Sequence, residues 1–333
     1  MNILVTMPCG FIRDTFLTKD VVQQLSGLGH VAWNTGDRQW SPEELQELLA
    51  DTDICVTGWG TQRFDEVVLR KADRLKLVAH TGGTVATIVT PEFYERGIRI
   101  VSGNDAYARS VAEGVIAYIL LSLRRLPYFM EKLEQTGWVM PQYLNEGLLD
   151  QTVGLVGYGS VAKHLVPMLR AFHAKIKIYS SHLTAEQAGA LGIQKATLEE
   201  VMSTCKVVSL HSASTPATYH MINRELLGLM QRGSLLVNTS RGEILDEAAL
   251  VEVCRDRGVS AVLDVYEEED PLPKTSPLWG QPNILKIPHM AGPTVDQRRT
   301  VGLRLVNEIR RYINGEDLTM EIDAAAAERM TRK

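Results

Sequence analysis

Residues 152–162 read Thr-Val-Gly-Leu-Val-Gly-Tyr-Gly-Ser-Val-Ala, and this stretch decides the fold of the chain. An apolar strand leads into the glycines, and a helical pattern follows from Lys163 to Ala171. In a GxGxxG/A turn of this kind Gly157 permits the tight turn, Gly159 leaves room for a pyrophosphate, and Ala162 lets helix and strand pack closely. The free N–H groups at the start of the helix favour phosphate. The stretch therefore predicts a dinucleotide-binding α/β domain.

The second part of this fingerprint is an acidic residue about 20 positions further on, which hydrogen-bonds the adenosine ribose. Here the next predicted strand, residues 176–179, ends in Ser180, Ser181 and His182 without a carboxylate. Nothing there repels the 2′-phosphate of NADP, and no arginine is present to bind it. The expected cofactor is therefore NAD or NADP, with Ser180 and Ser181 at its adenosine end, and the preference between the two stays open.

Short apolar runs alternate with amphipathic, helix-like stretches over nearly the whole chain. Before the glycine turn, strands are predicted at residues 3–6, 31–33, 54–57, 77–79 and 100–102. From the turn onward they are predicted at residues 153–156, 176–179, 207–211, 235–238, 261–265 and 284–287. Such alternation with short connections predicts parallel sheets covered by helices on both faces. The fold class is therefore α/β, with two successive doubly wound units.

Three further stretches carry predictions about helices. Residues 106–130 are apolar on almost every face, which predicts a helix buried on several sides, either in a core or shared between domains or subunits. An amphipathic helix is expected from Val295 to Ile313, before the stop signal Asn314-Gly315. A helix with Ser41 as its N-cap and Pro42 in its first turn is also expected. The last residues, with alanines at 324–327, resemble a frayed tail.

Composition narrows the class of protein. The 333 residues are 45% hydrophobic and 23% charged, as in a soluble globular protein of about two domains. A net charge of −5 disfavours nucleic acid and anionic membranes as partners. The four cysteines form no metal-binding or disulfide pattern, which predicts reduced thiols, no metal site and a cytoplasmic location. The longest apolar run, residues 115–123, is shorter than a membrane span.

Several ordered motifs, together with the glycine turn, carry a family resemblance. They are Ser110-Val111-Ala112-Glu113, Val237-Asn238-Thr239-Ser240-Arg241-Gly242-Glu243, Leu263-Asp264-Val265-Tyr266, Ser276-Pro277-Leu278-Trp279 and Ile287-Pro288-His289-Met290-Ala291. In this order they resemble the D-isomer-specific 2-hydroxyacid dehydrogenases, the group that contains glyoxylate/hydroxypyruvate reductases and phosphoglycerate dehydrogenases. The resemblance extends over nearly the whole chain.

The resemblance implies a domain organisation. Residues 1–102 plus 293–333 would form a discontinuous, flavodoxin-like substrate domain, and residues 103–292 an inserted NAD(P)-binding Rossmann domain. Members usually form homodimers through the nucleotide domain, which would account for the apolar helix after Ala106.

Three residues are expected to carry the chemistry. Histidine suits proton transfer because its pKa lies near working pH, and His289 follows the last strand of the nucleotide unit. Arg241 would bind the substrate carboxylate through paired hydrogen bonds. A carboxylate would orient His289 and stabilise its protonated form. Counting from the strand selects Glu269 and counting back from Pro271 selects Asp270; we favour Glu269, because the strand end fixes the start of the loop.

The resemblance also implies binding residues. Substrate contacts are expected at Arg241, at His289, at the Gly82–Gly83 turn, whose N–H groups would hold the carboxylate, and at Trp59, whose indole suggests a modest, partly apolar substituent. Cofactor contacts are expected at Gly157, Tyr158, Gly159, Ser160, Val161, Ser180, Ser181, His211, Ser212, Ala213, Thr218, Thr239, Ser240, Asp264 and His289.

These residues predict an oxidoreductase that transfers a hydride between NAD(P)H and a small 2-keto/2-hydroxy acid of D configuration. The alternatives are a dinucleotide-sensing protein, such as the corepressors built on this fold, and a dehydrogenase of the formate or phosphite type. Fold alone does not separate these functions.

Overall fold

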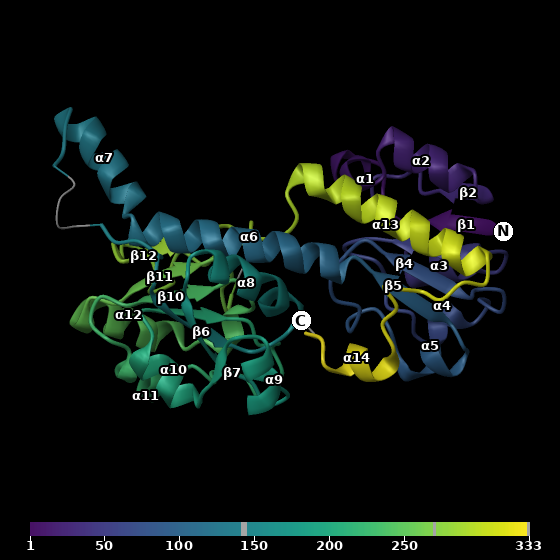
Figure 1. The fold of residues 1–333 in the computed structure, drawn as a ribbon. Coiled ribbons are helices and arrows are strands. Elements are labelled where there is room, and N and C mark those ends of the chain that lie inside the picture. The colour runs from purple at the N-terminus through teal and green to yellow at the C-terminus, as the bar shows by residue number, and fades with distance from the viewer. Residues whose placement is uncertain (141–144, 269–270, 332–333) are drawn as a thin grey trace. The chain divides into compact units, whose positions relative to one another are not determined.

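The computed structural model describes residues 1–140, 145–268 and 271–331, which divide into two compact units (Figure 1). Unit 1 consists of Met1–Ala108 and Pro293–Lys333, and unit 2 of Arg109–Gly292. The chain therefore leaves unit 1, builds unit 2 in one continuous stretch and returns to unit 1.

A five-stranded parallel sheet forms the centre of unit 1. Its strands are β1 (Asn2–Val5), β2 (His30–Trp33), β3 (Ile54–Thr57), β4 (Leu77–His80) and β5 (Arg99–Ser102). They lie in the order β2-β1-β3-β4-β5, which is the flavodoxin-like arrangement. All five strands expected from the sequence are present, and the predicted fold of this part is confirmed.

Helices cover both faces of this sheet. They are α1 (Phe11–Phe16), α2 (Lys19–Ser26), α3 (Pro42–Leu49), α4 (Glu66–Leu69), α5 (Pro91–Glu95), α13 (Val295–Ile313) and α14 (Ala324–Glu328). Successive side chains of a strand point to opposite faces, so Ile3 and Val5 pack in one core with α1, α2 and α13, and Leu4 packs in a second core with α3, α4 and α5. The capping box of Ser41 with Glu44 begins α3 as expected.

The C-terminal segment is ordered against unit 1, so the prediction of a frayed tail is wrong. The N–H of Ile322 donates to the carbonyl of Ile100 at 2.9 Å, and the N–H of Ser102 donates to the carbonyl of Met320 at 3.2 Å. Met320 and Ala327 are buried. The segment thus covers the edge strand β5, whose unpaired backbone groups would otherwise lie open to pairing with another chain.

A seven-stranded parallel sheet forms the centre of unit 2. Its strands are β6 (Thr152–Val156), β7 (Lys175–Tyr179), β8 (Gln194–Lys195), β9 (Val207–Leu210), β10 (Leu235–Asn238), β11 (Ser260–Leu263) and β12 (Ile284–Lys286). The order is β12-β11-β10-β9-β6-β7-β8, so the direction of winding reverses between β6 and β9. Ligands of doubly wound sheets bind at such a reversal, outside the carboxyl ends of the strands. The glycine turn at 157–159 follows β6 at this point.

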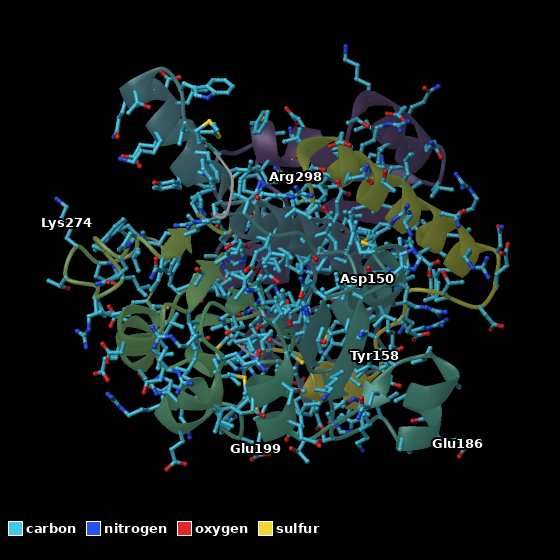
Figure 2. The ribbon with its side chains drawn as sticks, turned by 60° about the vertical axis from the view of Figure 1, so that its left-hand side comes forward. Asp150, Tyr158, Glu186, Glu199, Lys274 and Arg298 are labelled. Carbon is cyan, nitrogen blue, oxygen red and sulfur yellow. The ribbon has the colours of Figure 1, made fainter. Side chains whose placement is uncertain are left out.

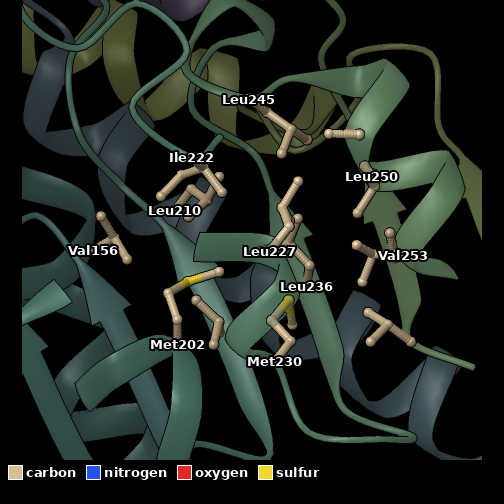
Figure 3. Packing of buried hydrophobic residues seen from close by; sticks show 14 of the residues in the cluster. Val156, Met202, Leu210, Ile222, Leu227, Met230, Leu236, Leu245, Leu250 and Val253 are labelled. Carbon is tan, nitrogen blue, oxygen red and sulfur yellow. The ribbon is translucent and has the colours of Figure 1, made fainter. Parts of the chain in front are cut away.

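Two hydrophobic cores hold the helices of unit 2 against the sheet, except the helix at residues 126–136, which has no buried residue. The helices are α6 (Asn104–Leu123), which begins in unit 1, α7 (Leu126–Thr136), α8 (Ser160–Ala171), α9 (Ala185–Ala190), α10 (Leu198–Thr204), α11 (Arg224–Leu229) and α12 (Glu247–Arg257). Charged side chains such as Glu186 and Glu199 point outward (Figure 2). On one face Leu210 and Leu236 pack with Met202 of α10 and Leu250 of α12 (Figure 3).

The helix expected over residues 106–130 is two helices, which corrects the prediction. Arg125 adopts a left-handed backbone with φ 52°, and Pro127 lies in the first turn of α7. Proline lacks the N–H that a continuous helix needs and clashes with the preceding turn, so the helix restarts here.

Among the described residues one helix, α6, is long and apolar enough to cross a membrane. Its Ala112, Val115, Ile119 and Leu123 are buried in the core of unit 2 with residues of β6 and α8. One side of α6 is therefore buried in the core of unit 2, and most other positions of the helix are partly or fully exposed.

Candidate active site

The glycine turn after β6 has no room for a side chain. Gly157 has φ 104°, and a Cβ there would lie 2.8 Å from the backbone nitrogen of Ser212 and 2.9 Å from the carbonyl carbon of His211. The N–H of Gly157 donates to the carbonyl of Tyr179 at 2.8 Å. The turn is therefore held between the ends of β7 and β9, with the predicted residues His211 and Ser212 beside it.

The start of α8 presents the groups that a pyrophosphate needs. Gly159 is the N-cap of this 12-residue helix, and within the described residues it has no side-chain cap hydrogen bond. A Cβ at Gly159 would have only the carbonyl oxygen of His211 near it, at 3.9 Å. The donors and the open approach fit the phosphates of a dinucleotide. Tyr158, Ser160 and Val161 lie on this turn, and Figure 2 labels Tyr158.

The predicted residues after β9 shape their own loop. The Ser212 hydroxyl donates to the carbonyl of Val156 at 3.2 Å, and the Thr218 hydroxyl donates to the carbonyl of Ala213 at 2.7 Å. Within the described residues the buried Nε2 of His211 has no hydrogen-bond partner. Burial lowers the pKa of His211 from 6.5 to about 4, so its ring is neutral at physiological pH.

The end of β7 is polar and carries no acid, as the sequence indicates. Ser180 is buried and its Oγ accepts the N–H of His182 at 3.3 Å, whereas Ser181 is exposed. A surface pocket of about 580 Å³ lies beside Ser180 and is also lined by Lys195 and Glu199. Lys195 belongs to β8, which sequence reasoning missed because this two-residue strand is exposed and has no apolar pattern.

The loop that carries Arg241 is built around the side chain of Asn238. Its Nδ2 donates to the carbonyl of Arg241 at 2.9 Å, and its Oδ1 accepts from the N–H and the hydroxyl of Ser240. One guanidinium nitrogen of Arg241 donates to the carbonyl of Ser240 at 2.7 Å. The Thr239 hydroxyl is buried without a partner among the described residues. The strand end therefore fixes the backbone on which Arg241 stands.

Close backbone packing joins this loop to the next one. A Cβ at Gly242 would lie 1.8 Å from the carbonyl carbon of Tyr266, so only glycine fits. The Tyr266 hydroxyl in turn donates to the carbonyl of Ile287, at the end of β12, at 2.8 Å. The loops after β10, β11 and β12 thus form one connected edge.

The carboxylate of Asp264 holds the segment that carries His289. It accepts the N–H of Met290 at 2.7 Å, the N–H of Ala291 at 3.0 Å and the hydroxyl of Tyr118 at 3.0 Å. Burial raises the pKa of Asp264, and these hydrogen bonds oppose the rise. His289 itself has φ 49°, a left-handed backbone that a non-glycine residue adopts only when its surroundings impose it.

The predicted acid partners of His289, Glu269 and Asp270, lie outside the described residues. The neighbouring Glu267 has other contacts, because its carboxylate accepts the Tyr219 hydroxyl at 2.7 Å and lies 3.1 Å from Nε2 of His220.

Unit 1 carries the predicted Gly82–Gly83 turn at the carboxyl end of β4. A Cβ at Gly82 would lie 2.3 Å from Nε2 of His80, whose Nδ1 lies 2.9 Å from the Thr57 hydroxyl. The carbonyl of Gly83 accepts the Ser102 hydroxyl at 2.8 Å. The N–H groups of both glycines donate no hydrogen bond within the described part of the chain. Gly82 is buried and Gly83 is partly exposed, so Gly83 is the accessible donor.

Trp59 follows β3 at the same edge of this sheet. Its indole is 44% exposed and packs edge-on against Phe16 and Tyr107, with ring centroids 5.4 and 6.3 Å apart. The guanidinium carbon of Arg298, on α13, lies 5.3 Å from the Trp59 ring centroid. Sequence reasoning missed Arg298 and Tyr118, because each contacts its partner across a long stretch of chain and belongs to no local motif.

Comparison with known proteins decides the family. Residues 116–291, more than half of the chain, match the family model described as D-isomer specific 2-hydroxyacid dehydrogenase, NAD binding domain. The chain belongs to this family. The match confirms the predicted family and the predicted NAD(P) class of cofactor.

Individual relatives agree with this assignment. The chain is 31% identical to D-3-phosphoglycerate dehydrogenase of Methanocaldococcus jannaschii over 95% of its own length and 58% of that protein. It is 29% identical to hydroxypyruvate reductase of Thermotoga maritima over 80% of its length and 87% of that protein. The crystal structure of the TT0316 protein from Thermus thermophilus superimposes with a TM-score of 0.78 at 27% identity, covering 97% of this chain and all of that one.

The chain spans about half the length of two phosphoglycerate dehydrogenases that it matches. It covers 58% of the M. jannaschii protein and 50% of the one from Bacillus subtilis. The likeness to those relatives therefore covers only part of them.

Asp264 and Tyr118 can be tested by a graded pair of variants. Asp264→Asn leaves one of the two N–H groups, of Met290 or Ala291, without an oxygen acceptor, so we expect the free energy of unfolding to fall by about 1–3 kcal/mol. Tyr118→Phe keeps both N–H groups paired and removes a single hydrogen bond, so we expect a loss of about 1 kcal/mol. Urea unfolding at pH 7 measures both. An Asp264→Asn variant as stable as the wild type would contradict the role given to this carboxylate.

His80 makes the stability of the protein depend on pH. Burial lowers the pKa of His80 from 6.5 to about 4. As pH falls from 6.5 towards 4, the unfolded chain binds a proton that the folded chain does not, so the free energy of unfolding decreases by up to about 1.4 kcal/mol per pH unit. We expect His80→Gln to flatten this dependence in urea unfolding between pH 7.5 and 4.5. His182→Gln, at an exposed position, is the control. Parallel pH profiles for the wild type and His80→Gln would show that His80 is not responsible.

Proposed function

We propose that this protein is an NAD(P)-dependent oxidoreductase that interconverts a small 2-oxo acid and the corresponding D-2-hydroxy acid. The main support for the proposal is that the Asp264 carboxylate accepts hydrogen bonds from the N–H groups of Met290 and Ala291. It fixes an exposed histidine, in a strained backbone, at the carboxyl edge of a dinucleotide-binding sheet. Strain of this kind collects at functional sites.

Each residue of the edge has a chemical task in this proposal. A bound nicotinamide nucleotide supplies the hydride. Arg241 binds the substrate carboxylate, since a planar guanidinium pairs with it through two hydrogen bonds. His289 donates the proton to the carbonyl oxygen during reduction and takes it back during oxidation. Glu269 orients His289 and stabilises its charged form.

Unit 1 by itself also carries groups that suit an anionic substrate. The N–H groups of Gly82 and Gly83 have no acceptor among the described residues, which suits them to an anionic ligand. Trp59 is 44% exposed, so part of its indole is accessible to a substituent. The relatives D-3-phosphoglycerate dehydrogenase and hydroxypyruvate reductase support a small hydroxy or keto acid as the substrate class.

The proton role of His289 is tested by replacing it with alanine. Loss of a general acid typically slows turnover by about 10²–10⁴-fold. We therefore expect His289→Ala to lower kcat by this amount in the oxidation of NADH or NADPH by glyoxylate, pyruvate or hydroxypyruvate. Affinity for the reduced cofactor, measured by fluorescence titration, should be kept. His30→Ala, at an exposed position of β2, is the matched control and should behave as the wild type. Turnover of His289→Ala near the wild-type rate would remove the catalytic assignment.

We also propose that the protein works as a homodimer in the cytoplasm. All four cysteines are free, and three of them are buried, as suits a reducing compartment. Helix α7 has no buried residue, and Leu126, Met130 and Leu133 form an exposed apolar stripe at helical spacing. A second copy of the chain is the proposed cover for this stripe.

Charges placed on the stripe test the dimer. We expect Met130→Glu combined with Leu133→Glu to convert a dimer into a monomer in sedimentation velocity, because buried unpaired carboxylates oppose association. Glu131→Lys, one residue away on the exposed helix, should leave the dimer intact. A wild-type protein that sediments as one chain, or a double variant that stays dimeric, would contradict the proposal.

A further inference from the structure

Arg298 lies in an aromatic setting on the first turn of α13, where Figure 2 labels it. Its guanidinium carbon is 5.3 Å from the ring centroid of Trp59 and 5.7 Å from that of Phe16. Phe16 is fully buried, and the two rings pack edge to face. Aromatic rings at these distances attract a guanidinium, which keeps N–H groups available for hydrogen bonds.

The charge of Arg298 is not matched by an acid. Its Nε donates to the carbonyl of Pro293 at 3.3 Å, and one Nη lies 3.5 Å from the Thr15 hydroxyl. Both acceptors are neutral and both distances are long. Within residues 1–140, 145–268 and 271–331 no carboxylate pairs with it. On the same helix, Arg299 pairs with Asp20 and Arg304 with Asp105.

Arg298 belongs to the same edge of unit 1 as the Gly82–Gly83 turn. Trp59 follows β3, and Tyr107 packs against it. The Tyr107 ring also lies beside Gly83, because a Cβ there would be 3.8 Å from it. Tyr107 lies between the free N–H of Gly83 and the indole of Trp59, and Arg298 lies beside that indole. This chain of contacts places a second anion-binding group on the same edge as the first, with two aromatic side chains between them.

We propose that Arg298 determines substrate specificity by binding a second negative group, a carboxylate or a phosphate ester, on a 2-oxo acid whose own carboxylate is held at the Gly82–Gly83 turn. The inference deepens the proposed function and rests on it. Arg298 is half-buried and has no carboxylate partner among the described residues, so an anionic ligand that forms an ion pair with its guanidinium would stabilise it. Trp59 alone suggests a substrate with a partly apolar substituent. With Arg298 beside it, we expect a substituent that ends in an anionic group.

A panel of substrates crossed with matched variants tests Arg298. Glyoxylate and pyruvate carry one carboxylate, oxaloacetate carries a second one, and 3-phosphohydroxypyruvate carries a phosphate. We expect the wild type to prefer an anionic substituent, and Arg298→Met to lower kcat/KM for that substrate by about 10- to 100-fold, the usual effect of losing a charge-assisted hydrogen bond. Activity on glyoxylate and pyruvate should be unchanged, which also shows that the variant is folded.

Two further variants separate charge from packing. Arg298→Lys keeps the positive charge but loses the planar, two-donor guanidinium and its contact with the aromatic rings. We therefore expect its preference for substrates with an anionic substituent to lie between those of the wild type and Arg298→Met. Arg299→Met removes an adjacent exposed arginine that pairs with Asp20, and it should leave every substrate unaffected. Comparison of kcat/KM for oxaloacetate and 3-phosphohydroxypyruvate shows whether a carboxylate or a phosphate is recognised. An equal loss on all four acids in Arg298→Met, or a wild type with no preference for an anionic substituent, would overturn the proposal.

Binding without turnover separates this proposal from the proposed function. D-malate and D-3-phosphoglycerate carry the second anion, and D-lactate does not. We expect the anionic ligands to raise the midpoint of thermal unfolding more than D-lactate does, and this difference to vanish in Arg298→Met. If no 2-oxo acid is reduced but the difference persists, the oxidoreductase function fails and the anion site stands. If turnover is found and the difference is absent in the wild type, the Arg298 proposal fails alone.

Discussion

Two consecutive N–H groups after His289 share one buried acceptor, the carboxylate of Asp264, and this interaction sets the geometry of the edge. Asp264 is 1% exposed and its hydrogen bond to Ala291 is buried, so leaving that donor unpaired would cost free energy. The same anion accepts the hydroxyl of Tyr118 from α6, which ties the histidine segment to the core helix. His289 keeps a left-handed backbone because the residues after it are held.

Adjacent loops extend this constraint across the sheet. Gly242 brings the backbone of the Arg241 loop against Tyr266, and the hydroxyl of Tyr266 reaches the end of β12. The cation proposed for the carboxylate and the histidine proposed for the proton therefore stand on loops that cannot move independently. Such rigidity favours catalysis, since the groups are oriented before substrate arrives.

The sequence predicts the strands of both sheets well, because buried parallel strands are short apolar runs between turn residues. Prediction from the sequence fails where contacts between distant parts of the chain determine the local structure. β8 has two exposed residues and no pattern, the helix after Asn104 breaks at Arg125, and the tail is ordered by contacts with β5. Family motifs predicted His289 and Arg241. The sequence does not predict Tyr118 or Arg298, because each contacts a partner that is distant along the chain.

Isotope tracing shows whether the protein transfers a hydride from the nicotinamide to the 2-oxo acid. The purified protein is incubated with a 2-oxo acid and NADH or NADPH that carries deuterium at C4 of the nicotinamide, and the product is analysed by mass spectrometry and chiral chromatography. We expect a D-2-hydroxy acid with one deuterium on C2 for one of the two C4 epimers of the cofactor. A product without deuterium for both epimers, or no reduction of any 2-oxo acid offered, would contradict it.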